Sequence, residues 1–145
     1  HKYLDPGQVT DADPKKSTSD IKILVVEDDS FLYSLIAERF VKEGYKILTA
    51  MDGAQTLKVL ETEIPDLILL DIIMPGMNGF EVLKKVKSDP KYNSVSVIIF
   101  SNLGQESEIE EAKKLGADDF LVKAKFTLKE VVDKINALLK KKGRL

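Results

Sequence analysis

The chain has 145 residues, a length that fits one globular domain, and its 22 lysine and arginine residues nearly balance 24 acidic residues. A net charge of −2 gives no indication of nucleic-acid binding, and the absence of cysteine excludes disulfides and thiolate catalysis. No apolar run approaches the length of a membrane span. The one histidine, His1, excludes a histidine-based catalytic triad and a histidine-rich metal site. We expect a cytoplasmic protein, because cysteine-free chains suit a reducing compartment.

Residues 1–20 are polar and contain two Asp-Pro steps, a composition typical of a flexible leader. Because the chain begins with His1 rather than Met, we expect this segment to be a linker or the remnant of processing or excision. The folded domain is predicted at 21–142, with a tail at 143–145. Four basic residues lie near the end: Lys140, Lys141, Lys142 and Arg144. They indicate either a solvated, basic helix end or a linker to an effector domain.

The first strand is predicted at 21–26, a short run rich in β-branched residues. A helix follows, which Gly44 is expected to end. Ser30 can cap it, and Asp29, one place beyond the acidic pair at 27–28, is expected to be a capping residue. Five apolar residues share one face of this helix: Phe31, Leu32, Leu35, Ile36 and Phe40. The run 46–50 is a weaker strand, expected at a sheet edge. The helix after it stops before Pro65.

Three further strands are predicted in the second half of the chain: 66–70, 95–100 and 119–122. The first of them leads through a turn-rich loop at 73–79 into a helix that ends at the Asp89-Pro90 step. The helix at 105–115 is very polar, and a capping box of Thr127 and Glu130 begins the last helix. Continuous apolar strands joined by helices predict a parallel sheet covered on both faces, an α/β three-layer sandwich.

Polar side chains stand at the carboxyl ends of four predicted strands: Glu27 and Asp28, Asp71, Ser101 and Lys123. Ligands of open α/β sheets bind at this edge, so we expect these side chains to meet there. Three carboxylates and one ammonium leave a charge of −2, which favours a bound cation. Oxygen ligands without histidine or cysteine indicate a hard ion, and Mg²⁺ fits best because it shares phosphate oxygens readily. The backbone carbonyl of Ile73 is expected to be a further ligand.

One carboxylate of this group can act as a nucleophile toward phosphorus. Asp71 is the candidate because it ends the central strand and the following loop can fold back over it. Mg²⁺, Lys123 and the Ser101 hydroxyl would then neutralise the phosphoryl oxygens. Taken alone, an aspartate before a turn is often a turn former, and a serine or lysine at a strand end is usually polar surface. The hypothesis therefore depends on their convergence at one edge of one sheet.

Four segments resemble the receiver domain of bacterial two-component response regulators, of the chemotaxis-regulator kind: VVEDD (25–29), LLDIIMPGMNG (69–79), FSN (100–102) and FLVKA (120–124). The resemblance covers about residues 21–142. It implies the flavodoxin-like (βα)5 fold, with five parallel strands in the order 2-1-3-4-5.

The resemblance also implies a role for each matching site residue. Asp71 would accept the phosphoryl group, and Asp28 would hold Mg²⁺ directly, with Glu27 acting largely through water. Ser101 and Lys123 would contact the phosphate. The implied donor is a phosphohistidine on a sensor histidine kinase or a histidine phosphotransfer protein.

The implied output begins at Phe120, an aromatic switch residue that turns inward on activation. The face formed by the fourth helix, fifth strand and fifth helix would then control a downstream protein or effector domain, with homodimerisation as one form of output. The sequence contains no DNA-binding motif and no apolar run of membrane-spanning length, so we expect no direct contact with nucleic acid or membrane. The resemblance also implies that the chain catalyses only its own phosphorylation and dephosphorylation.

Four positions depart from the family pattern. Asn102 follows Ser101 where the family favours a small residue, which narrows the expected access to the phosphate. Ala124 stands where proline is common, which leaves the isomer of the Lys123–Ala124 bond open. Ile73 and Leu103 are apolar and cannot orient a water molecule, which predicts a long-lived aspartyl phosphate. Two other functions stay open: a receiver-like docking module that works without phosphorylation, and a phosphatase with an aspartate nucleophile. The phosphatase chemistry commonly needs an acidic residue where this chain has Ile73.

Overall fold

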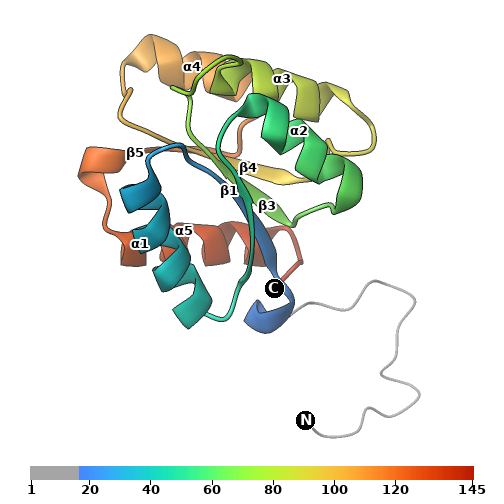
Figure 1. Cartoon of the computed structure of the whole chain (residues 1–145), viewed down its shortest axis with the longest axis vertical. Coiled ribbons are helices and arrows are strands. Elements are labelled where there is room, and N and C mark those ends of the chain that lie inside the picture. Colours follow the sequence, from blue (N-terminus) through green and yellow to red (C-terminus); the bar gives the residue numbers. More distant parts are fainter. Residues whose placement is uncertain (1–16) are drawn as a thin grey trace, which may run out of the picture.

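A computed structural model describes residues 17–145, so most of the leader predicted at 1–20 lies outside the described residues. Five parallel strands form one sheet in the order β2-β1-β3-β4-β5 (Figure 1). The strands are β1 (Lys22–Val26), β2 (Lys46–Ala50), β3 (Leu67–Leu70), β4 (Ser96–Ser101) and β5 (Asp119–Val122). The predicted fold class, strand order and edge position of β2 are confirmed, and each strand begins and ends within one residue of its predicted bounds.

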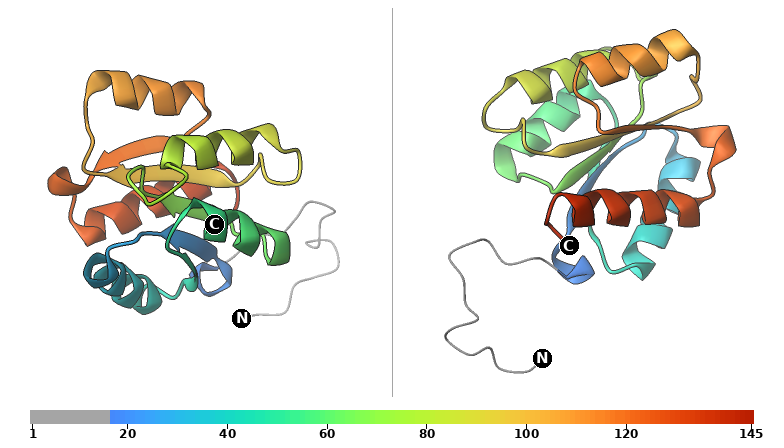
Figure 2. Two further views of the ribbon diagram at one scale, coloured as in Figure 1. Left: turned by 45° about the horizontal axis from the view of Figure 1, so that its top comes forward. Right: turned by 180° about the vertical axis from the view of Figure 1, so that it is seen from behind.

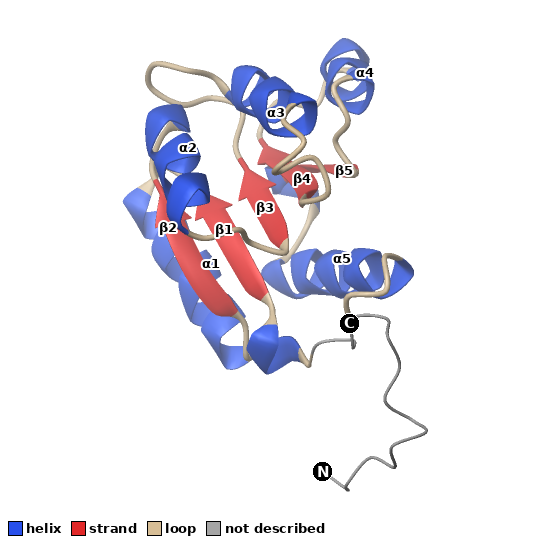
Figure 3. Cartoon of the chain, turned by 90° about the vertical axis from the view of Figure 1, so that its right-hand side faces the viewer, coloured by secondary structure: helices blue, strands red, loops and turns tan. Residues whose placement is uncertain are grey.

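Five helices cover the sheet: α1 (Ser30–Lys42), α2 (Gly53–Thr62), α3 (Gly79–Ser88), α4 (Glu106–Lys114) and α5 (Leu128–Lys141). Helices α1 and α5 lie on one face and α2, α3 and α4 on the other (Figures 2 and 3). Successive strand residues point to opposite faces, so that Ile23 and Val25 enter the core beside α1 and α5 while Leu24 and Val26 enter the other. Both faces are therefore buried, as the continuous apolar strands predict.

Two short 3-10 turns complete the described secondary structure, η2 (Thr18–Asp20) before β1 and η3 (Lys123–Lys125) between β5 and α5. Residues 17–145 contain no cis peptide bond, so the Lys123–Ala124 bond is trans. Over the same residues, no helix combines the length and the apolar character that crossing a bilayer requires.

The start of α1 distinguishes the two candidate caps. Asp29, not Ser30, is the N-cap, because its carboxylate accepts hydrogen bonds from the backbone N–H groups of Phe31 (3.0 Å) and Leu32 (3.1 Å). The expectation that Asp29 caps the helix is therefore confirmed, and Ser30, the other candidate cap, is the first helical residue.

The buried face of α1 is narrower than the apolar face predicted from the sequence. Ile36 and Phe40 are fully buried, whereas Phe31 is 73% exposed and Leu35 is 41% exposed. Phe31 lies five residues before Ile36, which at roughly 100° per residue turns it about 140° away from the sheet. Phe31 and Leu35, two residues of the predicted apolar face, therefore lie outside the core.

The C-terminal end of α5 matches the prediction in part. Thr127 and Glu130 form the predicted capping box at the start of the helix. At its other end, Lys140 and Lys141 are exposed. Lys142 and Arg144, however, form ion pairs with acidic residues of the domain, although Lys142 is still exposed.

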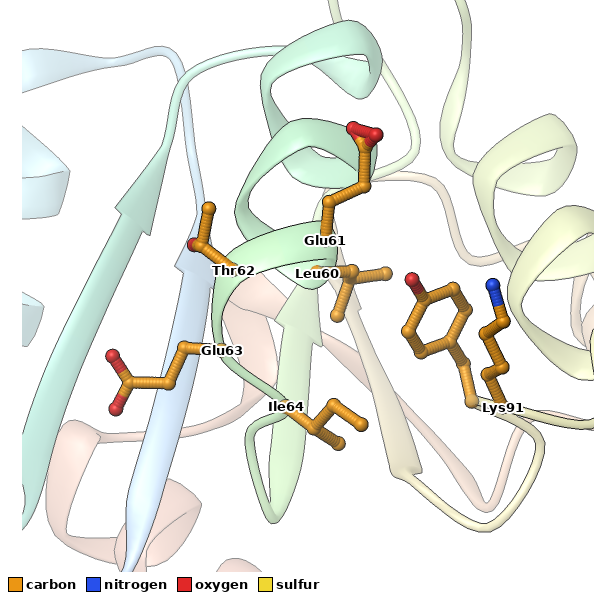
Figure 4. Close-up of a pocket in the computed structure, with 7 residues that line it drawn as sticks. Leu60, Glu61, Thr62, Glu63, Ile64 and Lys91 are labelled. Carbon is orange, nitrogen blue, oxygen red and sulfur yellow. The ribbon is translucent and has the colours of Figure 1, made fainter.

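An open hollow of about 650 Å³ lies between the C-terminal end of α2 and the loop that precedes β4 (Figure 4). Leu60 and Ile64 supply apolar walls, and Glu61 and Lys91 stand at its sides. The residues after α2 lead directly into the start of β3. The hollow therefore lies at the amino edge of the sheet, away from the predicted site.

Candidate functional site

The parallel register brings the predicted site residues to one edge of the sheet. Val26 pairs with Leu70, so the residues that follow them, Glu27 and Asp71, leave neighbouring strands side by side. Ser101 ends β4 and pairs with Val122, the residue before Lys123. Four strands thus deliver their polar side chains to the same carboxyl edge, which is where ligands of open α/β sheets bind.

Lys123 joins the two buried carboxylates of the site. Its Nζ lies 2.7 Å from Glu27 Oε1 and 3.0 Å from Asp71 Oδ2. Glu27 is 3% exposed, Asp71 is 6% exposed and the Lys123 side chain is 12% exposed. A buried charge needs a partner, and this shared ammonium is the partner of both acids.

Backbone amides hold the remaining oxygens of these carboxylates. Glu27 Oε2 accepts a hydrogen bond from Asp29 N (3.1 Å), and Asp71 Oδ1 accepts one from Ile73 N (3.3 Å). Ser101 is fully buried, and its Oγ accepts a hydrogen bond from Leu103 N (3.3 Å). The loops after β1, β3 and β4 therefore fix the orientation of the side chains that precede them.

Burial, hydrogen bonds and neighbouring charges together set the pKa values of Glu27 and Lys123. Burial raises the pKa of the Glu27 carboxyl, and the hydrogen bonds from Lys123 and Asp29 N only partly offset the rise. Burial also lowers the pKa of Lys123, but the hydrogen bonds and charges of Glu27 and Asp71 outweigh this effect and leave that pKa above its usual value. Lys123 therefore stays charged at neutral pH.

Three carboxylates form a cluster able to hold a metal ion. Glu27, Asp28 and Asp71 each offer one oxygen, and these oxygens lie within 4.8 Å of one another. Asp28 is exposed, and within residues 17–145 its carboxylate makes no hydrogen bond or ion pair. Three negative charges against the one positive charge of Lys123 leave −2. All the donors are oxygens, so the cluster fits a hard divalent cation.

Gly79 is a site residue whose role the sequence did not reveal. A Cβ atom added to it would lie 2.3 Å from the Asp71 carbonyl oxygen and 2.7 Å from Ile72 Cα. Its N–H donates to the Ile72 carbonyl at 2.8 Å. The start of α3 thus packs directly on the backbone of the candidate nucleophile, an approach that only glycine permits. The signal for it was the last glycine of the LLDIIMPGMNG segment.

Phe120, the predicted switch residue, is half-buried in β5 and pairs with Ile99 of β4. It packs against the apolar core on the side of α2, α3 and α4, as Ile99 does. Side-chain alternation along β4 places Ser101, two residues beyond Ile99, on that same face of the sheet. The arrangement brings the switch candidates Ser101 and Phe120 to neighbouring positions, while their roles stay predictions.

Comparison with known proteins identifies the family to which the chain belongs. A family model for the response regulator receiver domain matches residues 23–136. Sporulation initiation phosphotransferase F of Bacillus subtilis (strain 168) is 39% identical over 118 residues, 81% of this chain and 93% of the relative. Transcriptional regulatory protein CpxR of Escherichia coli (strain K12) is 39% identical over 120 residues, 83% of this chain and 50% of the relative. The chain spans 47% of a probable transcriptional regulator ycf27 of Guillardia theta and 22% of response regulator PleD of Caulobacter vibrioides.

Solved structures agree with the sequence comparison. Chemotaxis protein CheY4 of Vibrio cholerae is similar with a TM-score of 0.77 at 27% identity, covering 82% of this chain and 98% of that chain. A signal receiver domain of a signal transduction histidine kinase from Syntrophus aciditrophicus has a TM-score of 0.79 at 25% identity, covering 87% and 95%. The fold, the family match and these relatives agree: the chain belongs to the family of response regulator receiver domains.

Proposed function

We propose that Asp71 accepts a phosphoryl group from a phosphohistidine and that this domain thereby serves a two-component phosphorelay. The observation that carries the proposal is the buried Asp71 carboxylate, held 3.0 Å from Lys123 within a cluster of three carboxylates at the carboxyl edge of the sheet. The donor histidine belongs to a sensor histidine kinase or a histidine phosphotransfer protein. We place this reaction in the cytoplasm because the chain belongs to this receiver family. The receiver domain itself is proposed at residues 21–142.

The donor set supports Mg²⁺ as the metal. Asp28, Asp71 and the Ile73 carbonyl would hold it, and Glu27 would contribute largely through water. When bound, the ion would supply positive charge to the phosphoryl oxygens and offset the charge of −2 that the carboxylates leave.

The chemical step needs little more than a positioned nucleophile. A carboxylate oxygen of Asp71 forms the new bond to phosphorus while the bond between phosphorus and the donor nitrogen breaks, and the imidazole nitrogen keeps the bonding electron pair. Lys123 already lies within hydrogen-bond distance of Asp71, so its ammonium can donate to a phosphoryl oxygen without crossing the site. Burial of Asp71 limits water around the reacting group.

The output follows from the groups that then contact the phosphate. The Ser101 hydroxyl turns to donate to a phosphoryl oxygen, and Phe120 fills the space beside it. This shifts an existing equilibrium of the α4–β5–α5 face, which requires only a few kcal/mol of differential interaction. A downstream protein, an attached effector domain or a second copy of the chain would read that face.

The lifetime of the aspartyl phosphate is a separate proposal. Ile73 is 58% exposed beside Asp71, and Leu103 is half-buried two residues after Ser101. Neither side chain can orient a water molecule for attack on the phosphorus, so we expect slow hydrolysis. Ile73→Asn should shorten the half-life of the purified phosphoprotein several-fold. A wild-type label that is lost within seconds would contradict this expectation.

The proposed function is tested by labelling with acetyl phosphate and Mg²⁺, followed by intact-mass measurement. Wild-type protein should gain one phosphoryl group, and either Asp71→Asn or EDTA should abolish the gain. The matched control is Asp29→Asn, which removes a charge from the same edge but preserves the N-cap of α1, because asparagine caps as well as aspartate.

The other functions predict different results. Labelling of Asp71→Asn at the wild-type rate would place the nucleophile elsewhere. Absence of both labelling and Mg²⁺ binding in wild-type protein would favour a docking module. Repeated turnover of a phosphate ester would favour a phosphatase.

A further inference from the structure

The residues after α5 are fastened to the amino edge of the sheet, opposite the candidate phosphoacceptor. Lys142 Nζ lies 2.8 Å from Asp118 Oδ1, and Arg144 Nη1 donates to Asp66 Oδ1 at 3.3 Å. Asp118 directly precedes β5 and Asp66 directly precedes β3. Figures 1 and 2 show the C-terminus beside the start of β1. We call residues 142–145, with these two aspartates, the C-terminal clasp.

The aspartates of the clasp are themselves held by strand backbone. Asp66, whose side chain is 3% exposed, also accepts a hydrogen bond from Lys22 N at 2.9 Å. Asp118 Oδ2 accepts one from Val97 N at 2.8 Å and lies 3.6 Å from Lys87 Nζ of α3. The clasp therefore joins the end of α5 to four strand starts and to a helix on the other face of the sheet.

The backbone after α5 is equally ordered by hydrogen bonds. Gly143 has φ +73°, its N–H donates to the Lys140 carbonyl at 3.0 Å, and Arg144 N donates to the Leu139 carbonyl at 2.8 Å. This pair of bonds is a Schellman motif, which satisfies the last carbonyls of the helix and needs a left-handed residue such as glycine. Leu145 then packs against the core beside α1 and α5.

The opposite end of α5 is tied to the site. Its N-cap, Thr127, lies four residues after Lys123. Lys123 itself begins the 3-10 turn η3 that leads toward the helix. Lys123 now bridges Glu27 and Asp71. A phosphoryl group on Asp71 would offer its ammonium new acceptors, and any displacement of Lys123 passes through this short connection into the first turn of α5.

We propose that the clasp is a pivot: it fixes the C-terminal end of α5 while phosphorylation displaces the N-terminal end. This inference rests on the proposed function. A partner that distinguishes the two states would then read α5 at its first two turns, nearest β5, rather than along its whole length.

Hydrogen exchange of backbone amides tests the pivot, measured on the full chain with Mg²⁺, before and after addition of acetyl phosphate. In wild-type protein, phosphorylation should change exchange at residues 128–132 and leave residues 139–145 unchanged. Equal changes at both ends, or a change at the C-terminal end alone, would overturn the proposal. So would fully phosphorylated protein with no change anywhere in α5.

The clasp is tested in the unphosphorylated protein with a charge-matched pair of variants. Lys142→Gln/Arg144→Gln removes both ion pairs and should speed exchange at residues 139–145 about tenfold. Lys140→Gln/Lys141→Gln removes the same charge from exposed positions of the same helix end and should leave exchange unchanged. Equal effects of the two double variants would overturn the clasp. If the first pair fails to fold, Arg144→Gln alone makes the same comparison against Lys141→Gln.

The two sets of data separate the inference from the proposed function. Intact mass reports whether Asp71 is phosphorylated, and its failure would count against the proposed function alone. Exchange in the unphosphorylated variants reports on the clasp alone. Phosphorylated Lys142→Gln/Arg144→Gln protein should show changes spread to the C-terminal end of α5, because its anchor has been removed.

Discussion

At the scale of single residues, Lys123 supplies the positive charge that partly balances the carboxylates of the site. Its ammonium lies 2.7 Å from Glu27 and 3.0 Å from Asp71, two acids that are almost completely buried. A divalent cation held by Asp28 and Asp71, with Glu27 acting largely through water, would share the Glu27 and Asp71 carboxylates with Lys123. The lysine and the metal would therefore compete electrostatically, even though both are proposed to stabilise a phosphoryl group.

Lys123→Met should consequently bind Mg²⁺ about tenfold more tightly than wild type, because a positive charge a few ångströms from the ion is removed from a partly buried site. Isothermal titration calorimetry at fixed ionic strength measures the change. Lys125→Met, which removes an exposed charge from the same 3-10 turn, should have little effect. Unchanged or weaker binding by Lys123→Met would show that the ion and the ammonium do not share the carboxylates.

Substitution of Gly79 tests the close packing of α3 on the backbone of Asp71. Gly79→Ala places a Cβ 2.3 Å from the Asp71 carbonyl oxygen, so backbone must move, and we expect a loss of about 3 kcal/mol in the free energy of unfolding. Gly76→Ala is the comparison, because Gly76 has φ +73° but nothing within 4 Å of an added Cβ. That variant should lose only about 1–2 kcal/mol from backbone strain. Urea unfolding measures both, and similar losses would mean that steric contact at Gly79 is unimportant.

Helix α1 shows how far an amphipathic pattern determines an element. The sequence predicts the helix and its end, because periodic apolar residues and Gly44 mark them. It does not determine which apolar residues become buried, since that depends on the angle at which the helix meets the sheet. Phe31 and Leu35 satisfied the i, i+4 spacing and are nevertheless exposed. The neighbouring residues Asp29 and Ser30 offered two N-caps, and the bound backbone amides identify Asp29 as the cap.

Two phenylalanines of α1 therefore make a matched comparison. Phe40→Ala should reduce the free energy of unfolding by about 3–5 kcal/mol, because it empties a fully buried site. Phe31→Ala should change it by less than about 0.5 kcal/mol, because the side chain is 73% exposed. Urea unfolding of the two variants measures the difference. A large loss for Phe31→Ala would mean that the first turn of α1 packs against the domain.

At the scale of the whole molecule, the sheet has a distinct carboxyl edge and amino edge, because all five strands run in the same direction. Four of the five strand ends at the carboxyl edge, those of β1, β3, β4 and β5, contribute to one site. The convergence of Glu27, Asp71 and Lys123 could therefore be predicted from the positions of polar residues after apolar runs. The strand order came from the family resemblance, since handedness rules restrict a parallel topology without selecting one.

The opposite edge was not predictable in the same way. Ion pairs such as those of Lys142 and Arg144 join residues far apart in the sequence, and their partners depend on the final register of the sheet. A run of basic residues at a helix end carries no signal that distinguishes paired from solvated side chains. Gly79 likewise has a role only once α3 is packed on β3.

Chemical mapping of the phosphorylated residue tests the central claim most directly. Borohydride reduction converts an aspartyl phosphate to homoserine, which remains through proteolysis and is located by peptide mass spectrometry. After treatment of the full chain with acetyl phosphate and Mg²⁺, we expect homoserine at Asp71 and at no other acidic residue. Homoserine at Asp28 or at another carboxylate, with Asp71 unmodified, would contradict the account.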